Sequence, residues 1–230
     1  MKKSLAFLYF LFWIILALDC YLMQAGYQEN RLFTKTLLVP ILLIAIFVET
    51  SHTNHKRSKI LANLALTFCF LGDFFLLNDS NPNYFIVGLA SFLIGHLCFI
   101  VFFYRLKQYK PKYSNFLLVT SLGVFSYVAL LITILWGSID AQHLALPVTL
   151  YAFVLGLMLL SAIYSIKNRS IKKLATNHFI PGAVFFVISD SLLAINKFLL
   201  PIDYAGLAVM ITYGLAIFLL STGIIRFLRK

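Results

Sequence analysis

Residues 84–104 read YFIVGLASFLIGHLCFIVFFY, and this stretch decides the class of fold. The run contains no Asp, Glu, Lys or Arg, and it lies between Pro82 and Arg105. A helix rises about 1.5 Å per residue, so a run of this length crosses the hydrocarbon core of a bilayer, which is roughly 30 Å thick. The run therefore predicts a membrane-spanning helix with His96 near its middle.

The rest of the chain has the same apolar character. Hydrophobic residues make up 61% of the 230 residues and charged residues only 12%, whereas charged residues form about a quarter of an ordinary globular chain. Disordered, coiled-coil, disulfide-rich secreted and nucleic-acid-binding proteins need polar surface or cysteine, and these classes are excluded. We predict an all-α polytopic membrane protein, a single eight-helix transmembrane domain over 1–230. The expected spans are Ser4–Met23, Leu32–Val48, Lys59–Leu77, Tyr84–Tyr104, Ser114–Trp136, Leu144–Ile166, Asn177–Phe198 and Tyr204–Phe227.

Basic residues alternate between the predicted loops, and this pattern indicates the topology. Lys and Arg mark cytoplasmic loops, and 16 of the 19 fall at the two ends of the chain and in the second, fourth and sixth loops. The other side keeps Arg31, Lys35 and Lys197. We therefore expect both termini in the cytoplasm and membrane lipids as the contact of the basic loops. The polar turn at 78–82 separates the third and fourth spans.

Two short patterns recur at an offset of about half the chain. Asp73 follows Gly72 in the third span, and Asp190 follows Ser189 in the seventh, 117 residues later. The tripeptide Gly-Leu-Ala at 88–90 recurs at 206–208. These matches favour a parallel four-plus-four repeat, with chance recurrence in an apolar chain as the alternative.

Ionisable side chains inside spans mark function or a buried partner, because each costs about 2.5 to 3.5 kcal/mol to insert. The predicted topology places Asp19, Asp73, Asp190 and Lys35 in one outer layer, with Lys35 or Lys197 as partners for the aspartates. Two carboxyl groups in different surroundings can hold different protonation states and so supply a general acid and a general base. We therefore predict Asp73 and Asp190 as the catalytic pair, with helix-stabilising aspartates as the alternative. The supporting candidates are Lys35, His96, Tyr151, Ser189 and Tyr213.

The sequence predicts no metal site and no cofactor. Only His96 lies deep in a span, whereas His52, His55, His143 and His178 fall in loops or at a span end. Zinc ligands must converge at one depth, so a three-histidine zinc hydrolase is not supported. No G-x-S-x-G element, P-loop or dinucleotide fingerprint occurs.

The order of these elements resembles the YhhN-like family of multi-pass membrane lysoplasmalogenases. The resemblance runs through most of the chain, and the seventh span matches most densely. Thr36 and Ile217 depart from the family pattern, which usually has proline and often glutamine there. The matching residues are Thr34–Pro40, Gly72, Asp73, Gly95, His96, Pro147, Tyr151, Gly182, Ala183, Phe186, Ser189, Asp190, Leu193, Ala194, Ile211, Thr212, Tyr213 and Ala216.

The resemblance implies hydrolysis of the vinyl-ether bond of a lysophospholipid substrate, the lysoplasmalogen, to a fatty aldehyde and glycerophospho-ethanolamine or glycerophospho-choline. Protonation of the vinyl-ether β-carbon gives an oxocarbenium ion that water attacks, and two carboxyl groups can run both steps without metal. The polar head would lie near Lys35 or Lys197. The alternatives are a lipid or small-metabolite transporter or flippase, and an assembly factor whose aspartates pair with lysines. We expect an integral protein of a bacterial inner membrane; the oligomeric state does not follow from the sequence.

Overall fold

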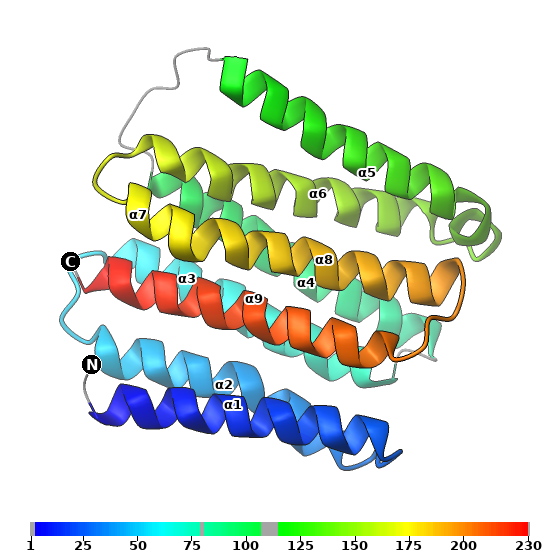
Figure 1. Cartoon of the computed structure of the whole chain (residues 1–230), viewed down its shortest axis with the longest axis horizontal. Coiled ribbons are helices and arrows are strands. Elements are labelled where there is room, and N and C mark those ends of the chain that lie inside the picture. The colour runs from blue at the N-terminus through cyan, green and yellow to red at the C-terminus, as the bar shows by residue number, and fades with distance from the viewer. Residues whose placement is uncertain (1–2, 79–80, 107–114, 230) are drawn as a thin grey trace.

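The computed structural model describes residues 3–78, 81–106 and 115–229 of the chain, and within them it is a bundle of long helices (Figure 1). Within these described ranges, eight helical segments are long and apolar enough to cross a membrane, which confirms the predicted number of spans. Asp79 and Ser80 of the predicted turn, and Lys107, Lys110 and Lys112 of the predicted basic loop, lie outside the described residues. The elements are α1 Lys3–Gln24, α2 Arg31–Glu49, α3 Lys56–Phe75, η1 Leu76–Asn78, α4 Pro82–Arg105, α5 Asn115–Ala141, α6 Ala145–Tyr164, η2 Ser165–Lys167, α7 Lys172–Leu174, η3 Ala175–Phe179, α8 Ile180–Phe198 and α9 Ala205–Leu228.

The fifth and seventh spans exceed their predicted lengths by the largest margins. α5 continues to Ala141 instead of ending at Trp136, because its last turns bury Leu135 and Ile139 against the core. The seventh span begins at Lys172, since α7 and the π-helix η3 continue directly into α8. The start predicted at Asn177 therefore falls inside a helix.

Helices that follow one another in the chain pack together in pairs, and α9 lies between the pairs. α3 packs on α4, α8 on α9 and α1 on α2, while α9 also contacts α1, α2 and α3. α5 lies at one edge of the bundle and contacts α6 and α8 (Figure 1). Both termini lie at one end of the bundle (Figure 1); their predicted cytoplasmic location stays a prediction.

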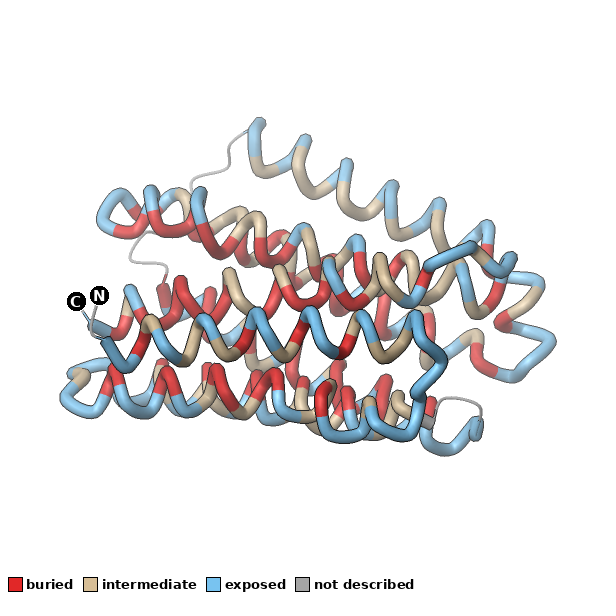
Figure 2. Tube along the Cα trace, turned by 60° about the horizontal axis from the view of Figure 1, so that its bottom comes forward, coloured by how far each residue is buried: buried red, intermediate tan, exposed pale blue. Residues whose placement is uncertain are grey.

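Burial follows the pattern of a protein in lipid rather than in water. Figure 2 shows the outward faces of the helices as exposed, and these faces carry large apolar side chains such as Phe33, Phe47 and Leu146. No residue in the most apolar stretch of α5 is buried, against 61% in that of α9. Apolar side chains facing outward have no cost in hydrocarbon, so the inward face is distinguished by small and polar residues.

Two glycines bring α3 and α4 close together. A Cβ at Gly72 would lie 2.4 Å from the Phe92 ring, and one at Gly95 would lie 3.0 Å from the Ala65 carbonyl oxygen. Small residues allow such close helix approach in membranes. The approach places Asp73, next to Gly72, and His96, next to Gly95, on the inner faces of adjacent helices.

Asp19 and Glu49 are also buried, and each lies beside an arginine. Asp19 is fully buried, lies 3.2 Å from Arg31 and accepts a hydrogen bond of 2.7 Å from Thr34. The observed partner of Asp19 is therefore the guanidinium of Arg31 at the start of α2, a residue that the sequence analysis did not name as a partner. Glu49 is buried beside Arg229, 3.5 Å away at the other end of the bundle.

Candidate active site

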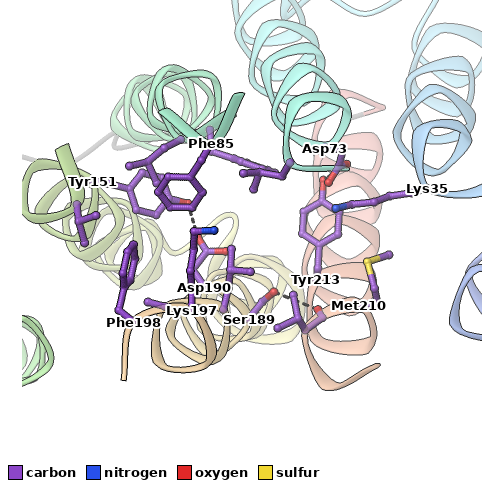
Figure 3. Close-up of a pocket in the computed structure, with 17 residues that line it drawn as sticks. Lys35, Asp73, Phe85, Tyr151, Ser189, Asp190, Lys197, Phe198, Met210 and Tyr213 are labelled. Atoms are coloured by element: carbon purple, nitrogen blue, oxygen red, sulfur yellow. Dashed lines mark hydrogen bonds between the residues drawn. The ribbon is translucent and has the colours of Figure 1, made fainter. Parts of the chain in front are cut away.

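The candidate site is a cavity of about 100 Å³ in the half of the bundle away from both termini. We call it the aspartate cavity, because Asp73 and Asp190 both line it (Figure 3). It has room for several water molecules. The other lining residues are Lys35, Leu76, Phe85, Leu89, Phe92, Val148, Tyr151, Ser189, Leu193, Ala194, Lys197, Phe198, Val209, Met210 and Tyr213.

One side of the aspartate cavity holds Asp73, which lies two residues before the end of α3. Its carboxylate is buried and accepts a hydrogen bond of 2.5 Å from the hydroxyl of Tyr213 on α9. Lys35 of α2 extends toward the same pair (Figure 3), and its ammonium group attracts the Asp73 carboxylate electrostatically. The pair thus joins α3 to α9, whose two residues are 140 positions apart in the sequence, and Lys35 adds a third helix, α2.

The other side holds Asp190, on the inner face of α8. The Tyr151 hydroxyl of α6 donates a hydrogen bond to Asp190 Oδ2. His96 Nε2 of α4 lies 3.0 Å from the Tyr151 hydroxyl and 3.8 Å from Asp190 Oδ2. Since the single hydroxyl proton of Tyr151 goes to the aspartate, Nε2–H of His96 is the donor to the Tyr151 oxygen. The direction of the chain is therefore from His96 through Tyr151 to Asp190.

The walls between these two groups are aromatic and apolar. The Tyr213 ring meets Phe92 and Phe186 edge to face, with ring centroids 6.0 and 5.6 Å apart, and Phe186 also packs against His96. Ser189 donates a hydrogen bond of 3.1 Å to the carbonyl oxygen of Val209. Ser189 therefore ties α8 to α9 beside the cavity.

The structure brings most of the predicted site residues to one place. Lys35, Asp73, Tyr151, Ser189, Asp190 and Tyr213 line the aspartate cavity. His96 does not line it and instead lies fully buried behind Tyr151. Asp19, the remaining member of the predicted charged layer, does not line the cavity and is paired with Arg31, although its charge also acts on the Asp73 carboxyl. Phe85, Phe92 and Met210 form walls that the sequence analysis did not single out; in a chain with 23 phenylalanines no local signal marks these.

The described residues contain no group of three or more His, Cys, Asp or Glu side chains that could hold a metal ion. The polar groups that line the cavity are the two carboxyl groups, the hydroxyl groups of Tyr151, Ser189 and Tyr213, and the ammonium groups of Lys35 and Lys197. In each aspartate the tyrosine hydrogen bond fixes the position of one carboxyl oxygen. The other oxygen is then available to contact a ligand in the cavity. Two such groups on one small cavity can give a proton to a bound molecule and take a proton from it.

These features define a class: an integral multi-pass membrane protein with paired carboxyl groups in an intramembrane cavity. Within that class, the chain belongs to the YhhN family, which it matches over residues 30–224. The matched region includes both aspartates and both tyrosines that bond to them.

Curated relatives carry one recurrent name. A lysoplasmalogenase of Mycobacterium bovis is 31% identical over 140 residues, which is 60% of this chain and 50% of the relative. The chain thus spans about half the length of this mycobacterial relative. Lysoplasmalogenase TMEM86B of Rattus norvegicus is 28% identical over 222 residues, 95% of this chain and 80% of the relative, and that of Homo sapiens is 26% identical over 188 residues, 82% of this chain and 73% of the relative. No solved structure matches the chain significantly.

Proposed function

We propose that this protein is a membrane hydrolase that cleaves the vinyl-ether bond of lysoplasmalogens, with Asp73 and Asp190 as the acid/base pair. The observation that carries the proposal is the pair of carboxyl groups on one cavity, each held by a tyrosine. The name lysoplasmalogenase shared by the curated relatives supports the substrate class. We expect the membrane to be a bacterial inner membrane.

The proposed reaction consumes one water and forms one aldehyde. One carboxylic acid donates its proton to the β-carbon of the vinyl ether, and the positive charge that results is shared between the α-carbon and the ether oxygen. The other carboxylate takes a proton from water as the water oxygen bonds to the α-carbon. The hemiacetal then breaks its carbon–oxygen bond to the glycerol. The second carboxyl group gives its proton to the glycerol oxygen, the first takes the proton of the hemiacetal hydroxyl, and the fatty aldehyde leaves with both carboxyl groups in their starting states.

The surroundings of the two aspartates suit a reaction in which one carboxyl group acts as the acid and the other as the base. Positive charge develops next to carboxylates in a cavity with few waters, where electrostatic stabilisation is stronger than in bulk water. The tyrosines fix the carboxyl groups, so little reorganisation is needed during the reaction. The aromatic walls formed by Phe85 and Phe92 offer an apolar surface to the lipid.

The experiment measures aldehyde release from a lysoplasmalogen by purified protein in detergent. Asp73→Asn and Asp190→Asn keep the side-chain volume and remove the titratable proton, so each should lower kcat by about 10²- to 10⁴-fold while the protein stays monodisperse. Asp19→Asn is the matched control, since Asp19 lies outside the cavity. Near wild-type rates in both folded cavity variants would show that the pair is not catalytic.

The transporter alternative gains no specific observation in the described part of the chain. Transporters of the repeated type place broken helices at matching positions, but α2 continues as a helix through Pro40, and Pro147 lies in the first turn of α6. Movement of labelled lysolipid across sealed vesicles by protein with no hydrolytic activity would favour transport instead.

A further inference from the structure

The aspartate cavity contains two lysines, and the structure gives them different surroundings. Lys35 extends toward Asp73 and Tyr213, while Lys197 is on the side of Asp190 and Tyr151 (Figure 3). The charge of Lys35 acts on the Asp73 carboxyl. The ammonium of Lys197 lies 4.6 Å from the centroid of the Phe85 ring. An aromatic face attracts an ammonium group and so holds it at the cavity wall.

Lys197 and Asp190 are spaced along α8 so that both face the cavity. Seven residues make about two helical turns, which puts the two side chains on the same face with their Cα atoms about 10.5 Å apart along the axis. Lys197 is the next-to-last residue of α8, and Phe198 ends the helix. A lysine near a helix end keeps its charge close to the membrane–water interface.

We propose that Lys197, held against Phe85, binds the phosphate of the lysophospholipid while the vinyl ether lies at Asp190 and Asp73. This inference rests on the proposed function and names which of the two lysines recognises the head group. It also orients the substrate, because the phosphate then lies toward the end of α8 and the hydrocarbon chain runs away from Lys197.

The dimensions of the substrate agree with this arrangement. Six bonds separate the α-carbon of the vinyl ether from phosphorus, which is about 7 Å in an extended chain at about 1.2 Å per bond. A charge-assisted contact between ammonium and phosphate oxygen adds about 2.8 Å. An extended unit thus covers about 10 Å. The long side chain of a helical lysine leans toward the N-terminal end of its helix, which for Lys197 is the direction of Asp190, so the two polar groups are closer together than their Cα atoms and one glycerophosphate unit can contact both residues at once.

The test compares two substrates that share the alkenyl chain and differ in the phosphate: 1-O-alkenyl-glycerophosphoethanolamine and 1-O-alkenyl-glycerol. Lys197→Met should raise KM for the phospholipid by about 10- to 100-fold, the factor expected for a hydrogen bond to a charged group. The change for alkenylglycerol should stay below about threefold. Lys197→Arg should restore most of the preference for phosphate, because it restores the charge.

The matched control is Lys59→Met. Lys59 also rests on an aromatic ring, with its ammonium 5.3 Å from the Phe47 centroid, but it does not line the cavity. The control should leave KM for both substrates at the wild-type value. If Lys35→Met selectively raises KM for the phospholipid and Lys197→Met does not, the assignment is wrong. Lys197→Gln replaces the Met variant if that protein is not monodisperse.

A binding measurement separates this inference from the proposed reaction. The probe is a 1-O-alkyl lysophospholipid, whose saturated ether cannot be cleaved, compared with 1-O-alkylglycerol. Tighter binding of the phospholipid that depends on Lys197 supports the head-group site even in a protein that hydrolyses no vinyl ether. Equal affinity of wild type and Lys197→Met for this probe overturns the site. Displacement by inorganic phosphate at matched concentration would identify a general anion site and overturn the assignment to a lipid head group.

Discussion

Removing one hydroxyl group tests whether Tyr213 acts through Asp73. The change is Tyr213→Phe, which keeps the ring that packs edge to face between Phe92 and Phe186. It deletes the hydrogen bond of 2.5 Å to the buried Asp73 carboxylate. A hydrogen bond to a charged group contributes about 1.5 to 3 kcal/mol, so kcat/KM for lysoplasmalogen should fall by about 10- to 150-fold. Protein stability should change far less than activity, since the ring stays in place.

The decisive measurement is a double-mutant cycle with Asp73→Asn. If the hydroxyl works only by holding the Asp73 carboxylate, Tyr213→Phe should cost less than about threefold in the Asp73→Asn background. Tyr151→Phe provides the matched comparison, because Tyr151 bonds to Asp190 and not to Asp73; it should cost the same factor in both backgrounds. Aldehyde release is measured on monodisperse protein for all variants. Equal losses from Tyr213→Phe in both backgrounds would refute the coupling.

Three further outcomes are expected. Asp19→Asn weakens the buried pair with Arg31, so thermal unfolding in detergent should show about 1 to 3 kcal/mol of destabilisation, while turnover per folded molecule stays at the wild-type level; a large loss of turnover would place Asp19 in the reaction. Exhaustive chelation should leave activity intact, because the described residues offer no metal-ligand cluster, and loss of activity that added zinc restores would contradict this. Reporter fusions after Asp79 and Asp140 should read as external and one after Lys110 as cytoplasmic; a cytoplasmic signal after Asp140 would overturn the topology derived from the basic loops.

The spans could be predicted from the sequence because bilayer thickness imposes a length on each helix. The rotation of each helix could not, since both faces of a span are apolar and the hydrophobic period that orients helices in water is weak in lipid. Asp73 and Asp190 could be singled out as charges that must face inward. Their partners could not be assigned, because Tyr213 is 140 residues from Asp73 and the chain has twelve tyrosines.

The partner of Asp19 could not be assigned from the sequence either. The predicted depths offered Lys35 or Lys197 as partners for the aspartates, and the structure pairs Asp19 with Arg31, one helical turn before Lys35 on α2. Residues four apart lie on the same face of a helix, so the position of α2 along its axis relative to α1 decides which basic residue reaches Asp19. The sequence does not determine that position.

The offset of 117 residues also relates His96 to Tyr213. Under this offset Asp190 corresponds to Asp73, and His96 corresponds to Tyr213. Asp73 accepts a hydrogen bond from Tyr213, and Asp190 lies 3.8 Å from His96, so the two contacts are equivalent under the same offset. This equivalence favours the hypothesis of a four-plus-four repeat. We propose the repeat on that basis.

The bond between Asp73 and Tyr213 also has a consequence for how the protein is made. Asp73 is on the third span and Tyr213 on the eighth. At about 5 to 20 residues per second, ribosomes need roughly 7 to 28 s to synthesise the 140 residues between them. Throughout that interval the nascent chain contains Asp73 but not yet Tyr213, the residue that donates a hydrogen bond to it in the folded protein. A product released before α9 is complete leaves this acid without the tyrosine, so the site is complete only once the eighth span has been made.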